Sequence, residues 1–259
     1  MKVRSVRRSG FVACAVATVV LLGASPASAD PGDGSAYGAT VEVTLLGQSA
    51  VSLGPVAPSN TDGPTENSVL GIGAANILTA GVIETEAMRN DETGVVNSSA
   101  TVADLSLQIL GFLGTDIGAD AVTATCTATQ DGITGTTELV GLNLGSLGGG
   151  SANPAPNTVL DVMVGPVQVA TLTLNEQISN PDGSLTVNAM HLVLIPGVLG
   201  ALGTGDVVIS SATCGPAAPP VPLASGAGLW IGLAAVGVFA LPVGARFVRS
   251  RRAQATQAA

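Results

Sequence analysis

The chain has few of the side chains from which most catalytic and metal sites are built. Its 259 residues include one histidine, His191, and three cysteines. Zinc and haem sites draw their ligands mainly from histidine and cysteine, so neither site is expected. A serine triad also needs a histidine. Ser210 or Ser211 with His191 and an aspartate stays open, although no G-x-S-x-G segment is present. The simpler interpretation of His191 is a histidine packed within a strand.

Aromatic and basic residues are also scarce in the central part of the chain. Residues 30–222 hold two aromatic side chains, Tyr37 and Phe112, so stacking platforms for sugars or bases are not expected. One basic residue, Arg89, stands there against all 18 acidic residues, a formal charge of −17 with His191 neutral. Such a surface repels nucleic acid. It either attracts divalent cations and basic partners or simply keeps the protein soluble.

The N-terminus has the pattern of a secretory signal. Four basic residues precede an apolar run at 11–23, and Ala27-Ser28-Ala29 follows as a small-residue cleavage site. The apolar run is about 13 residues long, which is short for a membrane span. We therefore expect cleavage between Ala29 and Asp30, with residues 1–29 forming the signal helix.

The C-terminus has the pattern of a membrane anchor. Residues 223–245 carry no charge, and as a helix they would be roughly 34 Å long, enough to cross a hydrocarbon core of about 30 Å. The tail at 246–259 contains four arginines, which are retained on the cytoplasmic side. The proline-rich residues 216–222 are expected to be an extended spacer. A sorting signal for attachment to peptidoglycan is the alternative, although the usual Thr-Gly cleavage pair is missing.

Two cysteines remain after removal of the signal, Cys126 and Cys214. In an exported protein an even pair of cysteines indicates a disulfide. The alternative is two buried, unreactive thiols. We expect the disulfide.

Residues 30–215 consist of short β-prone segments separated by turn residues. Strands are expected at 37–46, 51–53, 76–87, 94–109, 119–129, 133–140, 158–164, 167–174, 184–195 and 206–214. Asp131-Gly132 predicts a tight hairpin, and the polar residues 54–67 predict a long loop. Simple alternation within 94–109 would place Val102 and Asp104 on one face and Leu105 and Leu107 on the other. The whole pattern predicts an all-β fold: a single β-sandwich-like ectodomain flanked by the signal helix and the transmembrane helix.

Calcium is the one metal that the acidic residues leave open. Asp116 and Asp120 flank a glycine, and Asp30 and Asp33 lie in the leader of the ectodomain. Hard oxygen ligands in loops suit calcium, but no D-x-D-x-D-G loop is present. No cofactor and no catalytic, cofactor-binding or metal-ligating residue is therefore assigned from the sequence.

Four motifs occur in order along the ectodomain. They are S-A-Y-G-x-x-V at 35–41, DAVTATC at 120–126, LTVNAMHL at 185–192 and GDVVISSATCG at 205–215. In these segments the chain resembles the choice-of-anchor P family. Its members are exported proteins of high-GC Gram-positive bacteria that share an ectodomain and differ in their C-terminal anchor. The resemblance implies anchoring at the cell surface. It implies no activity and no catalytic residues.

These patterns together predict a membrane-anchored cell-surface protein with a non-enzymatic module for adhesion, envelope structure or ligand capture. The expected partners are the membrane, through the C-terminal helix, and cell-wall components. The alternative function is a surface hydrolase that uses carboxylates or a serine with His191.

Overall fold

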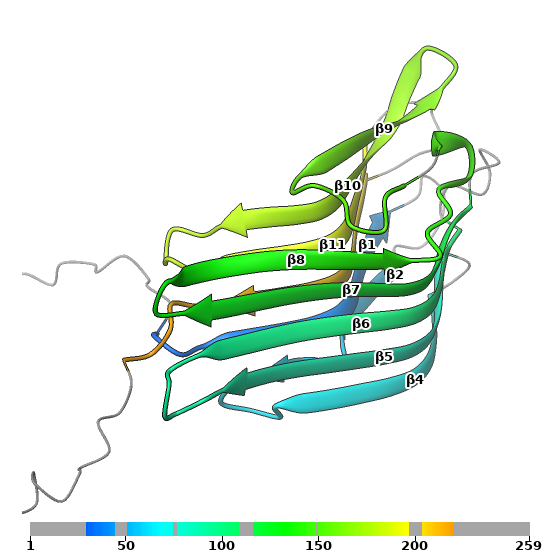
Figure 1. Ribbon diagram of the computed structural model, residues 1–259. Helices are drawn as coiled ribbons and strands as arrows, with labels where there is room; N and C mark the ends of the chain where they lie inside the picture. Colours follow the sequence, from blue (N-terminus) through cyan, green and yellow to red (C-terminus); the bar gives the residue numbers. More distant parts are fainter. Residues whose placement is uncertain are drawn as a thin grey trace, which may run out of the picture.

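The protein is a sandwich of two antiparallel β-sheets (Figure 1). The computed structural model describes residues 30–44, 51–74, 77–108, 116–148, 150–196 and 204–219. Sheet A has the strand order β2-β1-β12-β11-β10-β9, with the short β3 also paired to β1, and sheet B has the order β4-β5-β6-β7-β8. The expected all-β, sandwich-like fold of this domain is therefore confirmed, and the two predicted terminal helices lie outside the described residues.

The strands are long for a sandwich of this size. Sheet A contains β1 (Gly34–Thr44), β2 (Val51–Val56), β3 (Ser59–Asn60), β9 (Thr158–Val164), β10 (Val167–Ser179), β11 (Leu185–Leu194) and β12 (Thr204–Cys214). Sheet B contains β4 (Glu66–Ala74), β5 (Leu78–Arg89), β6 (Val96–Leu107), β7 (Ile117–Thr129) and β8 (Gly132–Val140). A short 3-10 helix, η2 (Gly145–Leu147), lies between β8 and β9.

The chain visits the two sheets in three stages. It begins in sheet A with β1, to which β2 and β3 pair, then crosses to sheet B and runs through β4 to β8 as a meander. It returns to sheet A for the meander β9 to β12. The last strand, β12, pairs with β1, so the two ends of the domain lie side by side at the centre of sheet A.

The core lies between the sheets and is built from aliphatic side chains. Its largest fully buried members include Ile83, Leu107 and Leu139 from sheet B and Leu172, Leu192 and Ile209 from sheet A. Strands β1, β11 and β12 of sheet A pack against β5, β6, β7 and β8 of sheet B. Burial of branched aliphatic side chains between two pleated surfaces is the main force that holds such a fold together.

One predicted loop contains parts of three strands. Residues 54–67 were predicted as one long loop, but they contain the end of β2, all of β3 and the start of β4. Strand β3 is too short to show an alternation of apolar residues. In β4, glycines stand between the apolar residues, so the alternation that indicates a strand is weak. In contrast, the hairpin at Asp131-Gly132 is confirmed, because Thr129 and Gly132 pair as the last residues of β7 and the first of β8.

Each sheet contains a row of residues, one on each of several neighbouring strands, at which the regular ladder pairing is interrupted. The sheet bends at this row. Beyond it, the odd- and even-numbered residues of a strand exchange faces. In sheet B the row passes through Gly71, Gly81 and Asp104, with Gly71 and Asp104 at positive φ. Consequently Val102 is buried before the row and Leu105 after it. The prediction that they lie on opposite faces is wrong, because a residue in the left-handed region shifts the phase of the strand.

The predicted cysteine pair joins the two sheets. Cys126 on β7 and Cys214 on β12 form a disulfide, with their Cα atoms 5.7 Å apart and a separation of 88 in sequence. Both residues are fully buried. The bridge therefore fixes the last strand of the domain to β7, an interior strand of sheet B.

The residues that follow β12 remain attached to the domain. Gly32 N donates to Pro216 O at 2.8 Å, and Ala218 N donates to Gly94 O at 2.9 Å. The side chain of Gln130 also donates to Ala218 O, at 2.7 Å. The first residues of the proline-rich spacer are thus held against the end of the sandwich where β1 begins and β12 ends.

Candidate functional site

The bend in sheet A creates a polar cluster on its outer face. The interrupted row there passes through Gly38, Ser210, Ala189 and Asn175, with Ser210 and Asn175 at positive φ. As in sheet B, the row reverses the alternation of side chains. Ala189 and Met190 are therefore both buried, so Asn188 and His191 lie on the same outer face although they are three residues apart.

His191 lies between two carboxylates on the neighbouring strands. Its Nδ1 is 2.9 Å from Oε2 of Glu176 on β10, and its Nε2 is 3.2 Å from Oδ2 of Asp206 on β12. Glu176 Oε2 also accepts a hydrogen bond of 2.7 Å from the side-chain amide of Asn188. The Glu176 and His191 side chains are each 19% exposed, whereas Asp206 is 55% exposed. The cluster thus spans three strands and is open to solvent at Asp206.

This geometry favours the protonated imidazole. A neutral ring has one N–H donor, so it can satisfy only one of the two carboxylates, whereas the imidazolium ion donates to both. Burial of the ring opposes the charge. The hydrogen bonds and negative charges of Glu176 and Asp206 outweigh that burial, and they raise the pKa of His191 above 6.5.

The stability of the domain is expected to depend on the protonation of His191. Because the pKa of His191 is raised in the folded state, its stabilisation is complete below about pH 6.5 and is lost as pH rises through the folded-state pKa. Urea unfolding from pH 5.5 to 9 should show a decline in the free energy of unfolding that His191→Gln removes. An identical decline in both proteins would contradict this assignment.

Two buried polar atoms beside this cluster have no hydrogen-bond partner. They are Oδ1 of Asn188 and Oγ of Ser211, in side chains that are 5% and 1% exposed. Asn188 and Ser211 are paired across β11 and β12, and Tyr37 of β1 is paired with Ser211 on its other side. Buried polar atoms are normally satisfied, so this row has unused hydrogen-bonding capacity.

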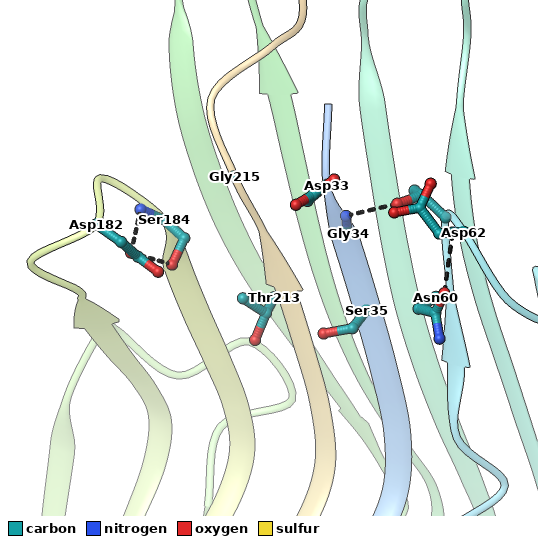
Figure 2. A pocket seen from close by; sticks show the side chains of 10 residues that line it. Asp33, Gly34, Ser35, Asn60, Asp62, Asp182, Ser184, Thr213 and Gly215 are labelled. Carbon is teal, nitrogen blue, oxygen red and sulfur yellow. Dashed lines mark hydrogen bonds between the residues drawn. The ribbon is translucent and has the colours of Figure 1, made fainter. Parts of the chain in front are cut away.

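An aspartate-lined pocket of about 290 Å³ lies at the end of the same face, where β1 begins (Figure 2). Ser35 and Thr213 form its floor, and the carboxylates come from Asp33, Asp62 and Asp182. The hydroxyl and backbone N–H of Ser184 both donate to Asp182 Oδ1 and lower the pKa of Asp182. The pocket is therefore anionic at neutral pH.

A second pocket of about 500 Å³ lies at the other end of β1 and β12. Its carboxylates are Glu42 and Asp206, which are paired directly across the two strands. Val193 and Val51 add apolar surface, and Thr44 and Thr204 add hydroxyl groups. Like charges in directly opposed positions destabilise a sheet, so this end of the face has a site that favours a cation.

The structure separates the two serines considered for a triad. Ser210 faces the core and donates to Val122 O at 2.7 Å, so it is remote from the outer face. Ser211 lies on the outer face, but both ring nitrogens of His191 are engaged by Glu176 and Asp206. No pattern in the sequence links Glu176 and Asp206 to His191, because they lie on two other strands.

The acidic residues considered for calcium do not come together. Asp33 lines the aspartate-lined pocket, whereas Asp116 and Asp120 lie at the start of β7 in the other sheet. Among the residues that the structure describes, no group of three or more carboxylate, histidine or cysteine side chains is arranged to hold a metal ion. Calcium binding therefore gains no geometric support within these residues.

Several predictions concern residues outside the described ranges. They are the signal at 1–29 with its cleavage at Ala29 and Asp30, the transmembrane helix at 223–245 and the cytoplasmic tail at 246–259. In the described part of the chain, no helix has the length and hydrophobicity to cross a membrane. The location of the protein therefore stays a prediction from the sequence.

No family model, curated protein or solved structure matches the chain.

Proposed function

We propose that this chain is a membrane-anchored cell-surface protein whose β-sandwich is a non-enzymatic binding module. The observation that carries the proposal is the outer face of sheet A. It combines an aspartate-lined pocket, the His191 cluster and a second acidic pocket along the paired strands β1 and β12. Pockets in which a few polar groups converge are typical of binding sites. Its role would be ligand capture, adhesion or envelope structure.

The hydrolase alternative has less support from the same geometry. A general base must offer a lone pair within hydrogen-bond distance of the nucleophile. An imidazole that bonds to Glu176 and Asp206 through both nitrogens has no lone pair left for Ser211. The arrangement favours a charge-bearing structural and binding role for His191 over catalysis.

The attachment of the spacer fits a domain displayed close to a membrane. The described chain ends at Pro219, after Pro216 and Ala218 have bonded to the base of the sandwich. The predicted span begins at residue 223, and four extended residues reach about 14 Å at most. The aspartate-lined pocket, which includes Gly215, would then be at the membrane-proximal end and the second pocket at the distal end.

The proposed location is tested by the intact mass of the full chain recovered from cell fractions. We expect extraction by detergent alone, with the mass of residues 30–259. A variant truncated after Pro222 should appear in the medium with the mass of residues 30–222. Release of the full-length protein only after peptidoglycan digestion, with the tail missing, would show covalent wall attachment and contradict the retained anchor. Recovery of the untruncated protein from the cytosol would contradict export.

A further inference from the structure

The outer face of sheet A has an excess of negative charge that its own residues do not balance. Seven carboxylates lie on it or at its rim: Asp33, Glu42, Asp62, Asp161, Glu176, Asp182 and Asp206. The basic groups nearby in the described chain are His191 and Arg89. Arg89 bonds to Asp91 at 3.1 Å and approaches Asp62 at 3.9 Å. A partner with positive charge would therefore complement this face.

The two acidic pockets are aligned along the same pair of strands. Ser35 and Thr213 belong to the first pocket, and Thr44 and Thr204 belong to the second. The nine steps from Ser35 to Thr44 along an extended strand correspond to about 30 Å. A single metal ion or ammonium group can occupy one pocket only, whereas an extended polypeptide of about ten residues can reach both.

Between the pockets lie two buried hydrogen-bonding groups and a partly exposed aromatic ring. Oδ1 of Asn188 and Oγ of Ser211 have no partner, and Tyr37 is paired beside Ser211 on the same face. A tyrosine ring also packs well against the apolar stem of a lysine or arginine side chain.

We infer that the outer face of sheet A docks an extended, lysine- or arginine-rich segment of a partner polypeptide along β1 and β12. Basic side chains enter the aspartate-lined pocket at one end and the Glu42–Asp206 pocket at the other. The inference rests on the proposed binding function and specifies the chemistry of the partner.

His191 makes this docking dependent on pH. Glu176 on β10 and Asp206 on β12 bond to the ring, and the other titratable groups on the same face of the packed strands are Glu42 and Tyr37 on β1 and Asp161 on β9. When the ring is neutral, its single N–H group bonds to Glu176, the more buried of the two carboxylates. Asp206 then has no hydrogen bond from His191 and is available to a ligand. A proton on His191 and a basic side chain at Asp206 therefore compete.

The test measures binding of a fluorescent deca-lysine peptide to the full chain in detergent micelles by anisotropy. Two variants that each remove three negative charges are compared. The first is Asp33→Asn, Asp62→Asn and Glu42→Gln on sheet A. The control is Asp104→Asn, Asp120→Asn and Glu138→Gln, three exposed residues of sheet B that line neither of the two sheet A pockets nor the pocket at Glu66 and Glu84. We expect a loss of affinity of about tenfold in the first and less than about twofold in the control.

Several outcomes would overturn the inference. Equal losses in both variants would show unspecific attraction to a negatively charged protein. An equal affinity for tri-lysine and deca-lysine would show that the two pockets do not act together. Tighter binding of spermine or calcium chloride than of the peptide would indicate a small cation as the ligand. None of these results would affect the detergent extraction that tests membrane display, so the two proposals fail separately.

The pH dependence gives a second, independent readout. Deca-lysine should bind more tightly at pH 8.5 than at pH 5.5, and His191→Gln should bind with similar affinity at both values. If His191→Gln kept the full pH effect, His191 would not be the group that makes docking depend on pH.

Discussion

Replacement of both Cys126 and Cys214 by alanine is expected to lower the free energy of unfolding by roughly 4–5 kcal/mol. The two cysteines are separated by 88 positions, and closing a loop of this length restricts the unfolded chain by about that amount in the chain-entropy model. Guanidinium unfolding of the wild type and the double variant, monitored by circular dichroism, measures the difference. This is the largest single effect that we expect. Small domains typically have a free energy of unfolding of about 5–15 kcal/mol, so the loss would remove a large fraction of the stability.

The position of the bridge explains why the loss should be global. Cys126 lies on β7, which pairs with β6 and β8 in sheet B, and Cys214 ends the strand that pairs with β1 on one side and β11 on the other. Unfolding of either sheet is therefore coupled to the other. The control is the wild type in the presence of a reductant, which should match the double variant. Equal midpoints for the oxidised wild type and the variant would contradict a stabilising disulfide.

The fold class was predictable because its main signals are local. Period-two alternation over short segments, a turn at Asp131-Gly132 and an even pair of cysteines do not depend on the tertiary structure. Strand β4 was missed because Gly71 and Gly73 interrupt its apolar residues. An edge strand with one partner needs fewer apolar residues than a central strand, so its signal in the sequence is weak.

The candidate site was not predictable because it depends on where the alternation breaks. Asn188 and His191 are an odd number of residues apart, which in a regular strand would place them on opposite faces. The left-handed conformation of Ser210, and the interrupted pairing at Ala189, bring them to one face. Serine is not typical of this conformation, so Ser210 does not indicate the bend, and a single asparagine in the row, Asn175, is not enough to locate it.

The charges of the surface were predictable in number but not in place. The sequence shows that Arg89 is the one basic residue among the acidic ones of residues 30–222. It does not show that Asp33, Asp62 and Asp182, which come from three separate turns, line one pocket. That grouping arises because β12 inserts next to β1, which brings the first and last parts of the domain together.

The contact between Gly38 and Ile83 offers a second large effect, because Ile83 fills the space that a side chain at residue 38 would need. A Cβ atom added to Gly38 would overlap Cγ2 of Ile83, a fully buried side chain on β5. Gly38→Ala alone should destabilise the domain by about 1–3 kcal/mol through overpacking. Ile83→Ala alone should cost about 2–5 kcal/mol, because it leaves a cavity in the core.

The double variant distinguishes this packing argument from general fragility of the core. In Gly38→Ala with Ile83→Ala, the new methyl group occupies part of the space that the isoleucine leaves, so the two losses should not add. We expect the double variant to lie within about 0.5 kcal/mol of Ile83→Ala alone in urea unfolding. The matched control combines Gly38→Ala with Leu172→Ala, a buried leucine three strands away in sheet A, and there the losses should add. Additive losses in both pairs would mean that the close approach of β1 and β5 does not limit the size of residue 38.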